Sequence, residues 1–340
     1  MIGVYPGAAL ASWDVGGQTL ADVLSGIATA IQQPGTGVIN LSVGFEGGAG
    51  SDLLKLGIDS AFAAGWLVVA AAGNGGGSGS PPTYPADLPH VLTVGATDQN
   101  GNVASFSSRS RSVDLAAPGV NVLAAVPTWK DPSGFASLTG TSFSAPIVSG
   151  AASWLWTVRS SLDNTQISEL LRRSATDIDA RGFDISSGWG LLNIPAALAM
   201  QAPIRDPQEP NDDIVLVSGD GIFGGTQPLV DATLPRTHVA ARLDPAEDPA
   251  DVYRVYIPKG RQFVASVEHG TGVQLTLWGP RTQSIRERKK LQLRDLVDTG
   301  KSVQTYSLTR KGAYYYLAAT LAPGVPETQY LLSVALRVRQ

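Results

Sequence analysis

Between residues 1 and 200, short apolar runs alternate with stretches in which apolar residues recur at helical spacing. The apolar runs predict strands at 9–15, 38–43, 67–71 and 90–96. Amphipathic helices are expected at 18–32 and after the strand at 38–43. Their apolar stripes are Leu20, Val23, Leu24, Ile27 and Ile31 in the first, and Leu54, Ile58, Ala61 and Phe62 in the second. This alternation predicts an α/β fold with a doubly wound, mostly parallel sheet covered on both faces.

Three further helices are expected in the same region. The helix that begins near Ser142 is apolar or small almost all round, which predicts a position deep in the core. We assign Pro146 to its first turn, where a missing N–H is tolerated. A helix at about 166–174 has Asp163, Asn164 and Thr165 as candidate caps. A short helix at 194–200 closes the region.

Beyond residue 200 the pattern changes. Residues 201–213 contain three prolines and four acidic residues, which is typical of a linker. Apolar positions then alternate with a period of two, as in Tyr253, Val255 and Ile257. We predict an α/β domain over 1–200, a linker at 201–213 and a small antiparallel β-sandwich over 214–340. The charge-dense segment 281–301 is expected to be a solvated loop or hairpin, and at least one ring of Tyr314–Tyr316 a core residue.

Composition excludes several functional classes. The chain has 340 residues, of which 43% are hydrophobic and 16% charged, so it has enough apolar material to fold. A net charge of -4 gives no reason to expect a nucleic-acid partner. The absence of cysteine removes disulfides, thiol catalysis and cysteine metal sites. No apolar run is long enough to span a membrane, and Met1 is not followed by the pattern of a signal peptide. We expect a monomer.

Two short motifs carry candidate chemistry. In LTGTSFSAPIVSGAASWLW (138–156), Ser142 follows a Gly-Thr turn at the expected start of a helix, whose positive end favours developing negative charge. The alternative is a serine or threonine that only caps the helix. In VVAAAGNGGG (68–77), Asn74 follows a buried strand, at the end where ligands bind in open α/β sheets. Alone, this Asn-Gly pair is equally typical of a simple turn.

Together the motifs resemble a known family. GTSFSAPIVSG (140–150) and AAAGN (70–74) resemble the nucleophile and oxyanion signatures of the subtilisin-like serine proteases. VINLSVG (38–44), APG (117–119) and GWGLLNIPAAL (188–198) follow the order of that family, so the resemblance covers residues 1 to about 200. It implies that Ser142 attacks the scissile carbonyl of a polypeptide substrate, while its own N–H and the Asn74 amide bind the oxyanion.

The resemblance also implies the surroundings of the nucleophile. The first substrate pocket would be flanked by two segments that pair with an extended peptide: Ser42, Val43 and Gly44, and Ala71, Ala72 and Gly73. The chemistry needs no cofactor. A weak structural calcium site could use the carbonyls of Ala86, Leu88 and Val91, with Asp87 nearby; the alternative is an ordinary surface loop.

One departure from the family pattern concerns the catalytic base. Subtilases order their triad Asp, His, Ser, and both earlier segments precede anything found here; residues 1–10 resemble the segment just after the histidine helix. We expect His90, His238 and His269 to be structural or exposed. The chain is therefore expected to be part of an active protease and inactive as written. The alternative is a non-catalytic binding or scaffold protein, although a scaffold has no need for an oxyanion hole.

The second domain resembles the bacterial pre-peptidase C-terminal domain. The supporting stretches are EPND (209–212), DPADVYRVYIPKGRQFVASV (248–267), GAYYYLAATL (312–321) and YLLSVAL (330–336). This resemblance implies a role in secretion, maturation or attachment to substrate, often with removal at the linker. It also implies that the protein works outside the bacterial cell.

Overall fold

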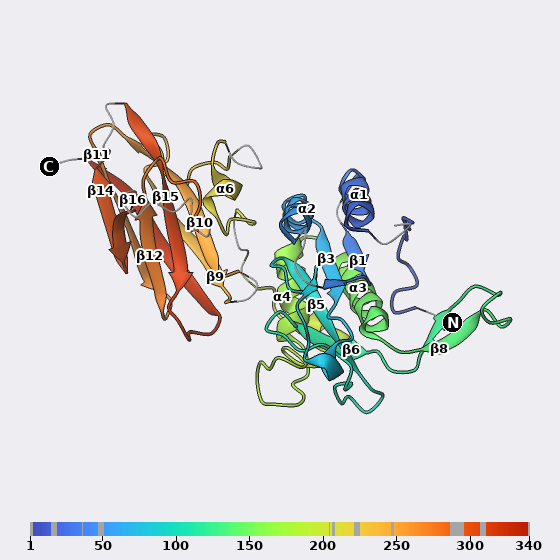
Figure 1. Cartoon of the computed structure of the whole chain (residues 1–340). Helices are drawn as coiled ribbons and strands as arrows, with labels where there is room; N and C mark the ends of the chain where they lie inside the picture. The colour runs from blue at the N-terminus through green and yellow to red at the C-terminus, as the bar shows by residue number, and fades with distance from the viewer. Residues whose placement is uncertain are drawn as a thin grey trace. The chain divides into compact units, whose positions relative to one another are not determined.

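The computed structural model describes residues 3–14, 19–35, 37–46, 51–203, 205, 208–220, 225–245, 248–285, 296–306 and 311–338. The chain divides into two compact units, Met1–Pro203 and Ile204–Gln340, whose elements are labelled in Figure 1. No helix in these ranges is both long and apolar enough to cross a membrane.

A parallel sheet forms the centre of the first unit. Its strands run in the order β1 (Val38–Leu41), β3 (Leu67–Ala71), β5 (Val91–Thr97) and β6 (Leu115–Pro118), and each pair of neighbours is parallel. Two short antiparallel pairs flank it: β2 (Phe45–Glu46) with β4 (Thr83–Tyr84), and β7 (Val122–Ala125) with β8 (Phe135–Leu138). The expected parallel α/β sheet is confirmed.

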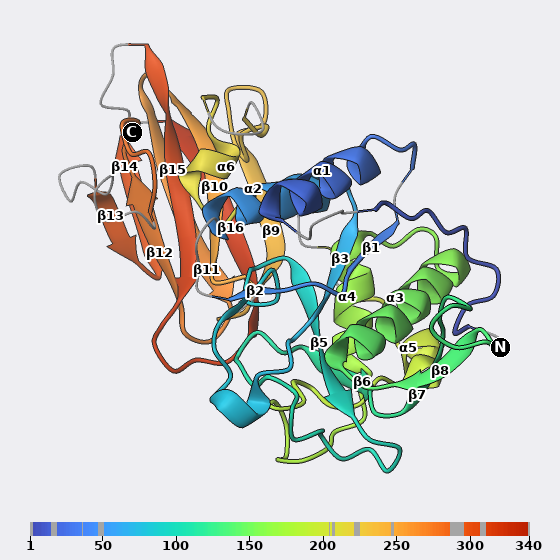
Figure 2. The same cartoon turned by 45° about the vertical axis from the view of Figure 1, so that its right-hand side comes forward.

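Helices cover both faces of this sheet (Figure 2). The core with α1 (Leu20–Ile31) and α2 (Ser51–Ala63) receives Val68 and Ala70 of β3. The opposite core, with α3 (Thr141–Val158), α4 (Asn164–Arg173) and α5 (Ile194–Ala199), receives Leu67, Val69 and Ala71. Alternate residues of β3 therefore enter different cores, because successive side chains of a strand point to opposite faces.

Most predicted elements of this unit are present, with shifted ends. β3 has the predicted bounds, whereas β1 stops at Leu41 and β5 begins one residue late. The capping box of Asp163 and Gln166 starts α4 at Asn164, which selects one of three candidate caps. The strand predicted at 9–15 is wrong: residues 9–14 form no strand, and Leu10 is 93% exposed. No described strand pairs with them, and an apolar run alone does not make a strand. Val15 lies outside the described residues.

The second unit contains two antiparallel sheets around one apolar core. The sheet orders are β10-β15-β12-β13 and β14-β11-β16-β9. Their bounds are Arg236–Leu243 for β9, Ala250–Pro258 for β10, Arg261–His269 for β11, Val273–Trp278 for β12, Leu296–Gly300 for β13, Ser302–Tyr306 for β14, Gly312–Leu321 for β15 and Thr328–Val338 for β16. Tyr253, Val255 and Ile257 of β10 are buried, as the period of two predicts. Tyr315 and Tyr316 are buried too.

The segment predicted as a linker contributes to the second unit. Asn211 and Asp212 are fully buried, and the N–H of Val252 donates to the Asn211 carbonyl at 2.9 Å. A short helix, α6 (Ile214–Val217), follows and packs against β10. Residues 286–295 of the charge-dense segment lie outside the described residues. Its last part, Leu296–Gly300, forms strand β13.

A buried ion pair joins α2 to the start of β5. The Asp59 carboxylate, 2% exposed, accepts from Lys55 Nζ at 2.6 Å and lies 3.1 Å from His90 Nδ1. Burial raises the pKa of Asp59, but the hydrogen bond and charge of His90, with the charge of Lys55, outweigh burial and lower this pKa below its ordinary value. His90 also stacks on Phe62, with ring centroids 4.4 Å apart.

The lowered pKa of Asp59 predicts acid-sensitive stability. Since the folded pKa lies below the ordinary 3.8, the ionised carboxylate stabilises the fold above that value, and the stabilisation is lost as pH falls through the folded pKa. Asp59→Asn is expected to lower the free energy of unfolding of the first unit by about 3 kcal/mol near neutral pH. In urea titrations, the wild-type chain should then lose more stability than D59N between about pH 5 and about pH 2. The control is Asp52→Asn, which replaces an exposed acid on α2 and should leave the pH dependence unchanged. If the free energy of unfolding fell equally steeply with pH in wild type and D59N, the role of Asp59 would be contradicted.

Candidate active site

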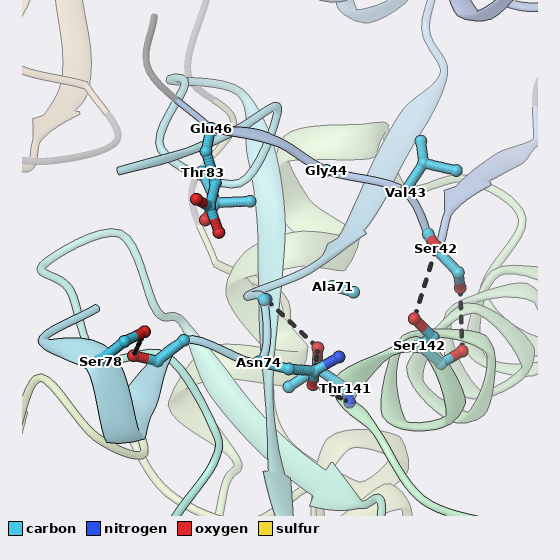
Figure 3. A pocket seen from close by; sticks show the side chains of 12 residues that line it. Ser42, Val43, Gly44, Glu46, Ala71, Asn74, Ser78, Thr83, Thr141 and Ser142 are labelled. Atoms are coloured by element: carbon cyan, nitrogen blue, oxygen red, sulfur yellow. Dashed lines mark hydrogen bonds between the residues drawn. The ribbon is translucent and has the colours of Figure 1, made fainter. Parts of the chain in front are cut away.

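A cleft opens where the carboxyl ends of β1 and β3 meet the N-terminus of α3 (Figure 3). It has a volume of about 350 Å³, and the residues that line it are Ser42, Val43, Gly44, Glu46, Ala71, Gly73, Asn74, Gly75, Ser78, Thr83, Thr141 and Ser142. Parallel strands place their carboxyl ends at one edge of the sheet, which is why segments distant in sequence meet here.

Thr141, the first residue of α3, is fully buried and fixes the orientation of Asn74. Its hydroxyl accepts from Gly73 N at 3.2 Å and donates to Asn74 Oδ1 at 3.1 Å. The N–H of Thr141 donates to the same oxygen at 3.0 Å. With Oδ1 held by two donors, the Asn74 Nδ2 group has no acceptor among the described residues and remains a donor for a ligand.

Ser142 is the second residue of α3, after the N-cap Gly140. Its side chain is half-buried, and Oγ donates to the Ser42 carbonyl at 3.4 Å. The N–H of Ser142 belongs to the first turn, where no carbonyl of the helix can accept from it. Together with Asn74 Nδ2, this N–H offers hydrogen bonds to an anionic oxygen, and the helix dipole favours negative charge at the same place.

Pro146 lies inside α3 and not in its first turn as predicted, because the helix already begins at Thr141. A residue at this position would normally donate its N–H to the carbonyl four residues earlier, that of Ser142. Proline has no N–H, so that carbonyl accepts from the Ser42 hydroxyl at 2.9 Å instead. The proline thereby frees an acceptor that ties the nucleophile candidate to the end of β1.

Most of the substrate-pocket residues expected from the sequence come together. Ser42, Val43, Gly44, Ala71 and Gly73 line the cleft beside Asn74 and Ser142. Ala72 does not: it is buried, and its N–H donates to Val94 at 3.0 Å.

Sequence reasoning missed five residues of the cleft: Glu46, Gly75, Ser78, Thr83 and Thr141. Thr141 directly precedes Ser142, so the motif itself pointed to it. Glu46 and Thr83 reach the cleft through the pairing of β2 with β4. No local pattern signals this pairing, since each of these strands has only two residues.

No described histidine lies among the residues that line the cleft. His90 is buried against Asp59 and Phe62. His238 and His269 are exposed on β9 and β11 of the second unit, with His238 Nε2 lying 3.6 Å from Glu268. A base for Ser142 is therefore absent from the described part of the cleft.

Two places offer oxygen atoms that could bind a cation. Of the candidates Ala86, Leu88 and Val91, the Ala86 carbonyl accepts from Thr93 Oγ1 at 2.7 Å, while the neighbouring Asp87 accepts from the N–H of Thr83 at 2.9 Å. In the second unit, three acidic residues place a carboxylate oxygen each within 4.8 Å of one another: Glu209, Asp248 and Asp251. The sequence did not suggest this cluster. Because acidic groups often lie close together without binding an ion, the cluster alone does not assign a metal.

Comparisons with known proteins identify what the first unit is similar to. The model of the subtilase family (Peptidase_S8) matches residues 1–190. Subtilisin DY of Bacillus licheniformis is 40% identical over 203 residues, which cover 58% of this chain and 70% of that protein. The alkaline protease of Alkalihalobacillus alcalophilus is also 40% identical, but only 50% of its length is covered. Among solved structures, the prenylagaramide maturation protease PagA is 30% identical, with a TM-score of 0.48 and coverage of 56% of this chain and 70% of that chain.

The contact between Ser42 and the Ser142 carbonyl can be tested with a double-mutant cycle. Ser42→Ala is expected to lower the free energy of unfolding by about 1 kcal/mol, because it leaves that carbonyl without its donor. In a Pro146→Ala background the helix N–H replaces the hydroxyl, so Ser42→Ala should then have an effect near zero. Urea unfolding of the four variants measures the coupling; equal losses in both backgrounds would show that Ser42 does not substitute for a helical hydrogen bond.

Proposed function

Since the chain belongs to the subtilase family, we propose that it carries the nucleophile and the oxyanion hole of a serine endopeptidase. The observation that supports this most is the pair of available donors, Asn74 Nδ2 and the N–H of Ser142, at the start of α3 beside the Ser142 hydroxyl. A helix cap without chemistry would not require Asn74 to be held by two bonds from Thr141.

In the proposed reaction, an extended peptide lies along Ser42–Gly44, and Ser142 Oγ attacks the carbonyl carbon of the scissile bond. The carbonyl oxygen becomes an oxyanion and is stabilised by Asn74 Nδ2 and the Ser142 N–H, which need no reorganisation as charge develops. The base that takes the Ser142 proton passes it to the departing amine, so that collapse of the oxyanion leaves an ester on Ser142, which water then hydrolyses.

The attack also requires a base that takes the proton of Ser142. In the family this is a histidine oriented by an aspartate, and no described residue of the cleft fills that role. We propose that residues 1–340 on their own cleave peptides poorly, because removal of the triad leaves only roughly 10³–10⁴ over uncatalysed hydrolysis. Full activity would belong to a protein in which the aspartate and histidine segments are present.

Labelling with a fluorophosphonate probe tests this function, since the reaction requires an activated serine. In the protein isolated from its natural host, we expect one label per chain, located on Ser142 by peptide mass mapping and absent in Ser142→Ala. The isolated 340-residue chain should label far more slowly. Asn74→Ala should reduce turnover by roughly 10²–10³, as measured for the equivalent asparagine of a subtilisin. A folded natural protein that takes up no label would instead favour a non-catalytic binding protein.

We propose no cofactor for the chemistry, and a structural calcium only at the loop with the carbonyls of Ala86, Leu88 and Val91. Support for it comes from the sequence, in which three carbonyls and the Asp87 carboxylate fall within six residues and offer oxygen ligands of the kind that a hard cation binds. Millimolar calcium should raise the melting temperature of the first unit by a few degrees, whereas magnesium, which demands a stricter geometry, should not. An equal response to both ions would mean that the loop holds no specific site.

For the second unit we propose a pre-peptidase-type β-sandwich that acts in secretion, maturation or attachment to substrate. The two antiparallel sheets and the apolar core to which both contribute support this assignment. We propose a monomer that works outside the bacterial cell, which agrees with the absence of cysteine and with the bacterial sources of the similar proteins.

A further inference from the structure

The cleft has a single acidic side chain among its lining residues, and no basic one. That residue is Glu46, which is exposed and takes part in none of the ion pairs between described residues. In Figure 3, Glu46 and Thr83 lie at one end of the cleft, Ser142 and Ser42 at the other, and Ala71 between them. A side chain that enters the cleft from a carbonyl at Ser142 therefore extends toward a negative charge.

Thr83 closes the cleft at the Glu46 end. It pairs with Glu46 in the β2–β4 ladder, and its side chain lies between the two walls of the cleft. A Cβ added to Gly44 would lie 2.6 Å from Thr83 Cγ2, and one added to Gly73 would lie 3.1 Å from Thr83 Oγ1. Glycine at position 44 is thus needed beside the threonine, whereas a Cβ at position 73 would crowd Ser108 Oγ, at 2.9 Å, before it crowded Thr83. Thr83 therefore lies close to Gly44 and Gly73 at this end of the cleft, which narrows the space for a bulky apolar side chain.

No ion pair between described residues compensates the charge at this end. The Thr83 hydroxyl donates to the Pro81 carbonyl at 3.1 Å, so it is already engaged, and the Thr83 N–H donates to the Asp87 carboxylate at 2.9 Å. A second carboxylate thus stands behind the closed end, and no ion pair between described residues involves it. Both acidic groups favour a cation in the cleft.

We propose that Glu46 makes this cleft select a peptide whose residue on the acyl side of the scissile bond is lysine or arginine. The long aliphatic stem of such a residue would pass between the glycine and alanine walls, and its cationic head would reach Glu46 in contact with water. The inference rests on the proposed function, because it takes the carbonyl at Ser142 as the reference point.

Binding of two labelled ligands tests the proposal without requiring turnover, on the protein in which the aspartate and histidine segments are present. The ligands are fluorescein-labelled tripeptide boronic acids that differ only in the last side chain, arginine or its neutral isostere citrulline. An exposed ion pair corresponds to a preference of up to about fivefold, so the arginine ligand should bind about fivefold more tightly by fluorescence anisotropy. Glu46→Gln should abolish the preference, and Glu46→Lys should reverse it toward a glutamate-ended ligand. Added salt should weaken it.

Asp52→Asn is the matched control, since this exposed acid of α2 does not line the cleft and should leave the preference unchanged. Circular dichroism establishes that each variant is folded. Equal binding of both ligands to the wild-type chain, or a preference that survives Glu46→Gln, would overturn the role of Glu46 and leave the proposed function intact. If neither ligand binds the folded wild-type protein in which the aspartate and histidine segments are present, the proposed function fails as well.

Discussion

The hydroxyl of Thr141 joins the first turn of α3 to the end of β3. It is fully buried and bonds both the backbone of Gly73 and the side chain of Asn74. A buried hydroxyl that loses its partners is unfavourable by about 1–3 kcal/mol, so this arrangement holds only while the strand and the helix stay in register. The orientation of the Asn74 amide and the position of Ser142 both follow from that register.

A second bond closes the cleft from the opposite wall. Pro146 removes the helical partner of the Ser142 carbonyl, and the hydroxyl of Ser42 takes its place. Ser142 is consequently held by the ends of β1 and β3 at once, with the central strand supported by apolar cores on both of its faces. A few hydrogen bonds at the edge of the parallel sheet thus fix the position of Ser142.

Sequence patterns predicted the framework of the first unit because its strands and helices have strong periods and large apolar faces. They also brought Ser142, Asn74 and the Ser42 segment to one site, through local motifs and the resemblance to a family. They failed where the structure depends on contacts between distant segments. The two-residue ladder that carries Glu46 and Thr83 into the cleft has no period to detect. Pro146 was misplaced because the helix start depends on the hydrogen bonds of Thr141.

Contacts between distant segments also decide two other cases. The apolar run at 9–14 has no strand partner in the described part of the chain. Asn211 and Asp212 have the polar composition of a linker, yet both are buried. In each case burial or exposure is decided by the neighbours that the fold supplies. Hydrophobic pattern reports a preference for burial, and tertiary contacts decide whether it is met.

The central claim, that Ser142 and Asn74 form the nucleophile and oxyanion hole of one site, is tested most directly by a crystal structure with a tripeptide boronic acid, of the protein in which the aspartate and histidine segments are present. The account predicts a bond from boron to Ser142 Oγ, with one boronate oxygen about 2.7–3.1 Å from both Asn74 Nδ2 and the Ser142 N–H. A boronate bound to Ser142 with no oxygen near Asn74, or bound at another residue, would contradict it.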